Sequence, residues 1–232
     1  MKSKTILFLV LLQTVFTIAM MSAHAQSAPY PAMAPLAQYM MPKAAEIALA
    51  KSAAPKAISD EAEVMVLTKV GYVTVKKGSN GFLCLVERGW AGDSTFADFW
   101  NPKQRAPNCF NQAAASSFAQ IYLMKTQLAL QGRSMQQIVQ ESVAAMASKK
   151  LPPLEPGAMC YMMSKQQYLN DHDKNWHPHL MFFVAGDVAK SWGADLPGSP
   201  VMAANDPEEG VTIFMVTVGH WSDGTPAPAM EH

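Results

Sequence analysis

Two amphipathic helix patterns stand between two groups of strand patterns, and this order limits the fold more than any other feature of the chain. The strand patterns cover residues 63–69, 71–77 and 82–88 before the helices, and residues 158–164, 178–184 and 211–218 after them. Apolar residues recur at spacings of three and four from Asn111 to Leu130 and again from Met135 to Met146. Because most strands follow one another without a helical crossover, the sequence predicts an α+β fold: a mainly antiparallel sheet of about five or six strands packed against a helical hairpin.

The segment from Phe82 to Arg88 shows the period of two that is typical of a strand, and we expect it to return from a turn at residues 78–81 as the second strand of a hairpin. One face would carry Phe82, Cys84 and Val86, and the other Leu83, Leu85 and Glu87. The residues that follow, from Gly89 to Asn108, are rich in aromatic side chains and predict a long irregular loop.

The amino terminus has the form of a cleavable signal peptide. Lys2 and Lys4 precede an apolar stretch from Thr5 to Met21, and Ala23-His24-Ala25 is a small-x-small cleavage site. We therefore expect residues 1–25 to be removed after Ala25 and the protein to be secreted or periplasmic. No later apolar run has the length of a membrane helix, so no membrane span is expected in the mature chain.

The mature chain divides into a leader and one domain. Residues 26–42 contain four prolines among alanine, methionine and other small residues, a composition that favours a disordered leader. Residues 43–232 are expected to form a single α+β domain with an irregular C-terminal tail from about residue 222.

Charge and cysteine content set further limits. The chain has 18 basic and 18 acidic side chains, so it lacks the positive charge on which nucleic-acid binding depends, and that class of function is excluded. In an oxidising compartment its three cysteines, Cys84, Cys109 and Cys160, predict one disulfide and one remaining thiol. Their spacing alone does not choose among the three pairings.

Polar residues gather from Asn170 to His179, where the segment contains three histidines and the carboxylates of Asp171 and Asp173. On a strand that begins at about His179, the side chains of His177 and His179 would share a face, as two ligands of one metal ion must. The sequence contains 17 methionines, of which three precede Gln26, and thioethers bind Cu(I). One hypothesis is therefore a copper-binding protein that uses His177, His179 and methionines.

A structural role for His179 competes with that hypothesis, and it is the one we favour. The imidazole would be a hydrogen-bonded interior group at the start of an apolar strand. We accordingly assign no metal site and no cofactor.

The tryptophans fall in or beside predicted loops, and Trp90, Trp100 and Trp176 are the candidates for an aromatic wall around a ligand. This placement predicts a binding or interaction module for a small-molecule or polymer ligand. An equal alternative is that the tryptophans anchor the long loops to the edge of the domain. The alternative function is an extracytoplasmic hydrolase in which His179 acts with Asp171 or Asp173.

Four short motifs resemble those of a group of uncharacterised secreted bacterial proteins. They are Gly78-x-Asn80-Gly81-x-x-Cys84, Pro107-x-Cys109, Tyr161-Met162 and Pro178-His179-x-Met181, and the similarity extends from about Glu63 to Val218. The resemblance implies that Cys84 and Cys109 form the disulfide, which leaves Cys160 reduced. This chain departs from the group in having Cys160 and a longer aromatic loop, and the resemblance implies no activity, cofactor or substrate.

Overall fold

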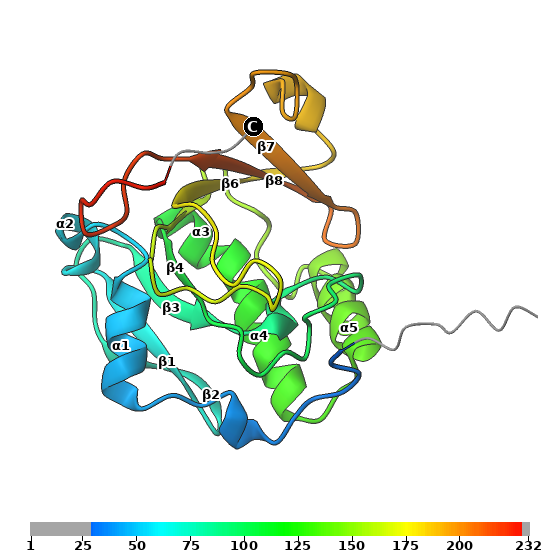
Figure 1. The fold of residues 1–232 in the computed structure, drawn as a ribbon. Coiled ribbons are helices and arrows are strands. Elements are labelled where there is room, and N and C mark those ends of the chain that lie inside the picture. Colours follow the sequence, from blue (N-terminus) through cyan, green and yellow to red (C-terminus); the bar gives the residue numbers. More distant parts are fainter. Residues whose placement is uncertain (1–28, 229–232) are drawn as a thin grey trace, which may run out of the picture.

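The computed structural model describes residues 29–228, so the predicted signal peptide lies outside the described residues. Eight strands form one sheet in the order β2-β1-β3-β4-β5-β6-β8-β7 (Figure 1). The strands are β1 (Glu63–Thr68), β2 (Gly71–Lys76), β3 (Leu83–Glu87), β4 (Ala106–Phe110), β5 (Met159–Met162), β6 (His179–Ala185), β7 (Val201–Asp206) and β8 (Val211–Thr217). The helices are α1 (Lys43–Lys51), α2 (Lys56–Ser59), α3 (Gln112–Ser116), α4 (Phe118–Leu130) and α5 (Met135–Ala147), with short 3₁₀ turns at Leu36–Gln38, Gly89–Ala91 and Ala189–Trp192.

The α+β class is confirmed, but the sheet is larger than predicted and it is mixed. Strands β1 and β3 pair in parallel, whereas the other neighbouring strands pair antiparallel. The segment after β2 does not close a hairpin with β3, as we expected, because it passes across the start of β1. A Cβ atom on Gly78 would lie 2.2 Å from the backbone nitrogen of Glu63, so only glycine permits this close passage. Strand β3 then enters on the far side of β1.

Strand β4 begins inside the segment that was expected to be an irregular loop up to Asn108. All five of its residues are buried, and it pairs with β3 on one side and β5 on the other. The segment Ala106-Pro107-Asn108-Cys109-Phe110 has no β-branched residue and contains a proline, which lowers its intrinsic strand preference. Burial between two neighbouring strands, rather than local preference, therefore holds it in the sheet.

The helical layer contains one helix more than the predicted hairpin. Its first predicted helix divides at Ser117, whose backbone angles are φ −125° and ψ −82°, so α3 and α4 are separate. The predicted end signals are present: Asn111 accepts a hydrogen bond from the backbone N–H of Ala114, and Ser134 forms a capping box with Gln137.

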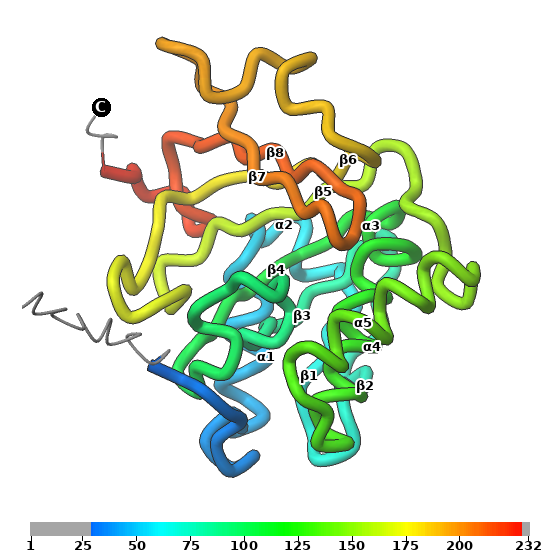
Figure 2. Tube along the Cα trace, turned by 90° about the vertical axis from the view of Figure 1, so that its right-hand side faces the viewer, coloured from blue at the N-terminus to red at the C-terminus, as the bar shows by residue number. Residues whose placement is uncertain are grey.

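The two faces of the sheet are covered by different helices (Figures 1 and 2). Leu83, Leu85 and Phe110 pack with residues of α4 in one core cluster. Cys84 and Val86 pack with residues of α1 in another. The alternation predicted for residues 83–86 therefore places β3 between α4 on one face and α1 on the other.

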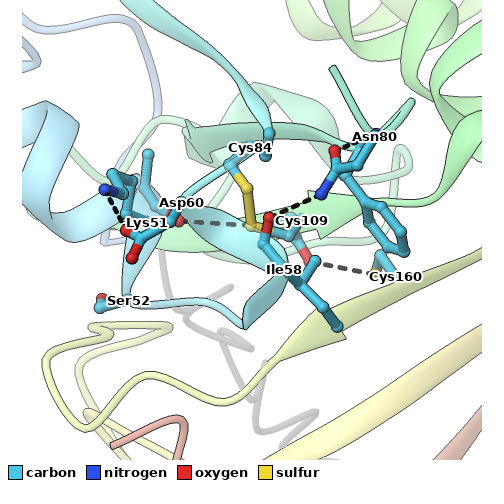
Figure 3. The surroundings of a disulfide bond; sticks show 12 residues. Lys51, Ser52, Ile58, Asp60, Asn80, Cys84, Cys109 and Cys160 are labelled. Carbon is cyan, nitrogen blue, oxygen red and sulfur yellow. Dashed lines mark hydrogen bonds and ion pairs between the residues drawn. A yellow bond between two sulfur atoms is a disulfide. The ribbon is translucent and has the colours of Figure 1, made fainter. Parts of the chain in front are cut away.

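A disulfide joins Cys84 of β3 to Cys109 of β4 on the α1 face, the pairing that the resemblance implied (Figure 3). The two residues are also register partners in the sheet. Beside the disulfide, the side-chain amide of Asn80 donates a hydrogen bond of 2.8 Å to the carbonyl oxygen of Ile58. Cys160 is free and buried.

Residues 29–42 belong to the folded domain, where we expected a disordered leader. Tyr39 is fully buried, and its hydroxyl donates a hydrogen bond of 2.8 Å to the carbonyl oxygen of Trp100 and accepts one from the backbone N–H of Ala34. The prolines disfavour long helices and strands, but they do not prevent the aromatic side chain of Tyr39 from packing against Trp90, with ring centroids 4.8 Å apart.

The C-terminal residues from 222 to 228 form no helix or strand, and backbone hydrogen bonds hold them in place. Ser222 donates to the carbonyl oxygen of Met163, and Ala227 donates to that of Gly219. Across residues 29–228, no helix combines the length and the apolar character that a membrane crossing requires.

Candidate ligand-binding cavity

A cavity of about 370 Å³ lies on the α4 face of the sheet. Its floor is made by side chains of β3, β4, β5, β6 and β8. Its walls are α4, the loop after β3, the loop before β6 and the turn between β7 and β8. Lining residues from these elements include Glu87, Asn108, Met162, His179, Met181 and Met215 from the strands, Phe118 and Tyr122 from α4, and Asp93, Phe96, Gln104, Asn170, Trp176, Asp206 and Glu209 from the connections and strand ends.

Strand periodicity and register bring the floor residues together. Glu87 ends β3 and lies two positions after Leu85, so it faces the α4 side of the sheet. His179 begins β6 directly opposite Met162 of β5, and Met181 lies opposite both Cys160 and Met215. The cavity floor is therefore polar at Glu87 and His179, and the thioethers of β5, β6 and β8 line the rest of it.

Glu87 is the most unusual group in the cavity. Glu87 is only 8% exposed, and the Oε1 atom of its side chain has no hydrogen-bond partner. Burial raises the pKa of the Glu87 carboxyl well above its ordinary value, an effect that Lys125 opposes and Glu209 reinforces. Gln104 is similar, since it is 7% exposed and its Oε1 also lacks a partner. Buried polar groups without partners are rare in folded proteins.

A buried ion pair lies beside the cavity, and one of its members, Glu209, belongs to the lining. Lys125 of α4 pairs with Glu209 in the β7–β8 turn, and their side chains are 1% and 4% exposed. The Lys125 ammonium also donates hydrogen bonds to the carbonyl oxygens of Ala91 and Gly92, at 3.2 and 3.0 Å. Lys125 therefore connects the loop after β3 to the β7–β8 turn. Burial raises the pKa of Glu209 despite the opposing effect of Lys125.

The imidazole of His179 is 2% exposed and has a defined orientation. Its Nδ1 atom lies 2.7 Å from the carbonyl oxygen of His177. Because a carbonyl oxygen can only accept, Nδ1 carries the hydrogen and Nε2 presents a lone pair. Burial lowers the pKa of His179 to about 4, so the ring is neutral at physiological pH. The ring of Trp176 lies against it, with centroids 4.7 Å apart.

The two carboxylates proposed to act with His179 have other partners. Asp171 accepts hydrogen bonds from Lys103, Tyr168, Tyr30 and Asn101 and is exposed. These hydrogen bonds hold the pKa of Asp171 below its ordinary value. Asp173 pairs with the exposed imidazole of His172 at 2.7 Å. Within residues 29–228, no hydrogen bond or ion pair joins either carboxylate to His179.

The remaining residues that the sequence suggested for a site lie either beside the cavity or in the core. Trp176 lines the cavity, whereas His177 does not, although its ring contacts that of Trp176 at a centroid distance of 6.3 Å. Trp90 and Trp100 are 1% and 5% exposed and pack in a core cluster with Tyr39. The structure therefore places His179 and Trp176 together and leaves Trp90 and Trp100 outside the cavity.

Sequence reasoning did not select Glu87, Gln104 or Asn108, which lie at the bottom of the cavity. Glu87 carried a signal, because it was the charged residue on a strand face otherwise made of leucines. Asn108 is fully buried and accepts a hydrogen bond of 3.2 Å from the Cys160 thiol. Burial raises the pKa of that thiol, which makes Cys160 a poor nucleophile.

A larger groove, of about 990 Å³, lies between residues 29–33, 94–100 and 132–137. None of the buried polar atoms that lack a partner belongs to its lining residues. Among residues 29–228, no group of three or more histidine, cysteine, aspartate or glutamate side chains is placed to hold a metal ion.

Comparisons with known proteins found no family model, no curated protein and no solved structure that matches this chain.

Proposed function

We propose that this protein binds a small organic molecule in the cavity between Glu87, His179 and Trp176. The observation that carries the proposal is the pair of buried oxygen atoms, Glu87 Oε1 and Gln104 Oε1, that have no hydrogen-bond partner and belong to residues lining this cavity. Leaving such groups unpaired costs about 1–3 kcal/mol each. A ligand that bonds to them would recover this free energy.

The composition of the walls supports the same proposal. Aromatic rings from Phe96, Phe118, Tyr122 and Trp176 and thioethers from the strands surround a few convergent polar groups. Small-molecule sites in proteins have this combination of apolar walls and a small number of placed polar atoms.

Methionine methyl groups provide a test, because they occur in the cavity and elsewhere. We would label these methyls with ¹³C and add phenethylamine, phenethyl alcohol or hydrocinnamate to the purified protein. The expected result is that the signals of Met162, Met181 and Met215 move with at least one of these probes, while that of Met41, which packs in the core cluster on the α1 face of the sheet, stays in place.

Two results would contradict the proposal. One is the absence of any change in the cavity methyls with all three probes. The other is a change confined to Met33 and Met135, which line the larger groove.

A second candidate function is copper binding, which one observation favours. His179 and the thioethers of Met162, Met181 and Met215 line the same cavity, and the Nε2 atom of His179 carries no hydrogen. Thioether sulfur and imidazole nitrogen are ligands for Cu(I). Titration with Cu(I) under reducing conditions would move the methyl signals of these three methionines if the metal binds there, and would leave them unchanged if it does not.

We also propose export, with cleavage after Ala25, which makes the protein secreted or periplasmic. The disulfide between Cys84 and Cys109 supports this location, because disulfides persist in oxidising compartments. The mass of the exported protein should correspond to a chain that begins at Gln26. A mass that includes Met1 would overturn the cleavage.

A further inference from the structure

Two buried side-chain oxygens of the cavity lining receive no hydrogen bond from the described residues. They are the Oε1 atom of Gln104 and the Oε1 atom of Glu87, which is an acceptor once its carboxyl is ionised. A ligand that satisfies both oxygens presents hydrogen-bond donors to them. An ammonium group has three donors and no acceptor.

The charge of the cavity points in the same direction. Its described lining residues include four carboxyl groups, those of Glu87, Asp93, Asp206 and Glu209, and no lysine or arginine. Lys125, which is not a lining residue, is already paired with Glu209. Glu87 therefore has no cationic partner within hydrogen-bond distance, although it is more than nine-tenths buried.

We infer that the ligand is a small organic amine whose ammonium group binds to Glu87 while its apolar part lies against Trp176 and Tyr122. This inference rests on the proposed function and names the class of ligand for the same cavity. The aromatic side chains of the walls can make two kinds of contact with such a molecule. They bury its hydrocarbon part, and the faces of their rings attract its cationic group.

A hard metal ion would also be attracted to carboxylates, but the geometry favours the amine. No three carboxylate, imidazole or thiolate side chains within residues 29–228 converge as metal ligands. An ammonium group needs only one carboxylate and a neutral acceptor, for which Glu87 and Gln104 are the candidates.

Amine binding should release a proton from Glu87. The groups that interact electrostatically with this carboxyl are Lys125 and Tyr122 of α4, Glu209 of the β7–β8 turn, Asn108 of β4, Cys160 of β5 and Tyr72 of β2. Burial among them raises the pKa of Glu87, so the free protein holds its carboxyl protonated at pH values where an exposed glutamate is charged. The ammonium favours the carboxylate, so amine affinity should rise with pH until Glu87 is ionised in the free protein.

Calorimetric titration of the purified protein with three probes of similar shape tests the inference. Phenethylamine is a cation, phenethyl alcohol is neutral and hydrocinnamate is an anion. We expect phenethylamine to bind at least about ten-fold more tightly than either of the others, because only the cation forms charge-assisted hydrogen bonds with the Glu87 carboxylate. Repeating the titration in buffers of different ionisation enthalpy should show proton release on amine binding.

The variant Glu87→Gln separates the charge from the shape of the side chain. It should weaken phenethylamine binding about ten- to a hundred-fold, abolish the proton release and leave binding of phenethyl alcohol nearly unchanged. Glu61→Gln, which removes an exposed carboxylate outside the cavity lining, is the matched control and should change none of these quantities. A thermal melt of each variant verifies that it is folded.

The outcomes distinguish this inference from the proposed function. If the alcohol or the carboxylate binds as tightly as the amine, the inference is wrong and the binding function stands. The inference is also wrong if folded Glu87→Gln binds phenethylamine as the parent does. If none of the three probes binds, both the inference and the proposed function fail.

Discussion

The indole ring of Trp176 lies against the imidazole of His179, with centroids 4.7 Å apart and planes inclined by 62°. The contact joins the loop before β6 to the first residue of that strand, and both rings line the cavity that contains Glu87. Trp90, by contrast, donates its indole N–H to Thr126 inside the core. Position in a loop therefore does not distinguish a tryptophan of the cavity from one of the core.

His179 should make the protein sensitive to acid. Burial lowers its pKa in the folded state to about 4, below the ordinary 6.5. Between these pH values the unfolded chain binds a proton that the folded chain does not, so stability is retained above pH 6.5 and lost as the pH falls toward 4. This linkage amounts to about 3 kcal/mol.

Urea unfolding of the parent and of His179→Gln at several pH values measures this effect. The free energy of unfolding of the variant should fall less than that of the parent between pH 6.5 and pH 4, because the variant has no imidazole at position 179. The matched control is His172→Gln, which removes an imidazole that is 94% exposed and should show the same fall as the parent. Equal pH profiles for the parent and His179→Gln would show that this ring is not the cause.

The disulfide should stabilise the domain by restricting the unfolded chain. Cys84 and Cys109 are separated by 25 residues, and a loop of that size corresponds to about 3 kcal/mol in chain-entropy models. Replacing both by serine should lower the free energy of unfolding by about this amount.

Cys160→Ala removes the free thiol and should leave the disulfide-linked peptide intact in a digest. A digest in which Cys160 is part of the bridge would refute the pairing.

The buried ion pair between Glu46 and Arg88 should be the most sensitive link between α1 and the sheet. The two charged atoms lie 2.9 Å apart, and the side chains are 1% and 0% exposed. Glu46 also accepts a hydrogen bond from the backbone N–H of Leu67. Glu46→Ala leaves the guanidinium buried without its partner, so it should cost about 3–5 kcal/mol of stability. Glu141→Ala, which breaks the exposed pair with Arg133, should cost less than about 1 kcal/mol in the same denaturation experiment.

Tyr39→Phe tests whether residues 29–42 belong to the domain. The variant removes the hydroxyl that connects Ala34 to Trp100 and keeps the ring, so we expect a loss of about 1–2 kcal/mol. Deuterium exchange should also become faster at the amide of Ala34, which loses its acceptor. An unchanged stability together with fast exchange of this amide in the parent would indicate that the segment is detached.

Local patterns in the sequence predicted the parts of the fold that depend on neighbouring residues. Period-two alternation assigned the faces of β3, and the capping signals of Asn111 and Ser134 marked the starts of helices. The start of β6 at His179 follows from Pro178, which cannot donate a ladder hydrogen bond.

The remaining features depend on contacts between distant segments. Strand β4 gains its hydrogen bonds from β3 and β5, and Tyr39 gains its burial from Trp90 and Trp100, none of which is visible in a local pattern. The cavity is also beyond local reasoning, because Glu87, Gln104 and His179 come from separate elements. Their place in one cavity depends on the strand order of the sheet.

A crystal structure of the protein grown with phenethylamine tests amine binding most directly. We expect the probe in the cavity, with its nitrogen within hydrogen-bond distance of Glu87 and its ring beside Trp176. A probe bound only in the groove beside Met33 and Met135, or a cavity that contains only water at saturating probe, would contradict it.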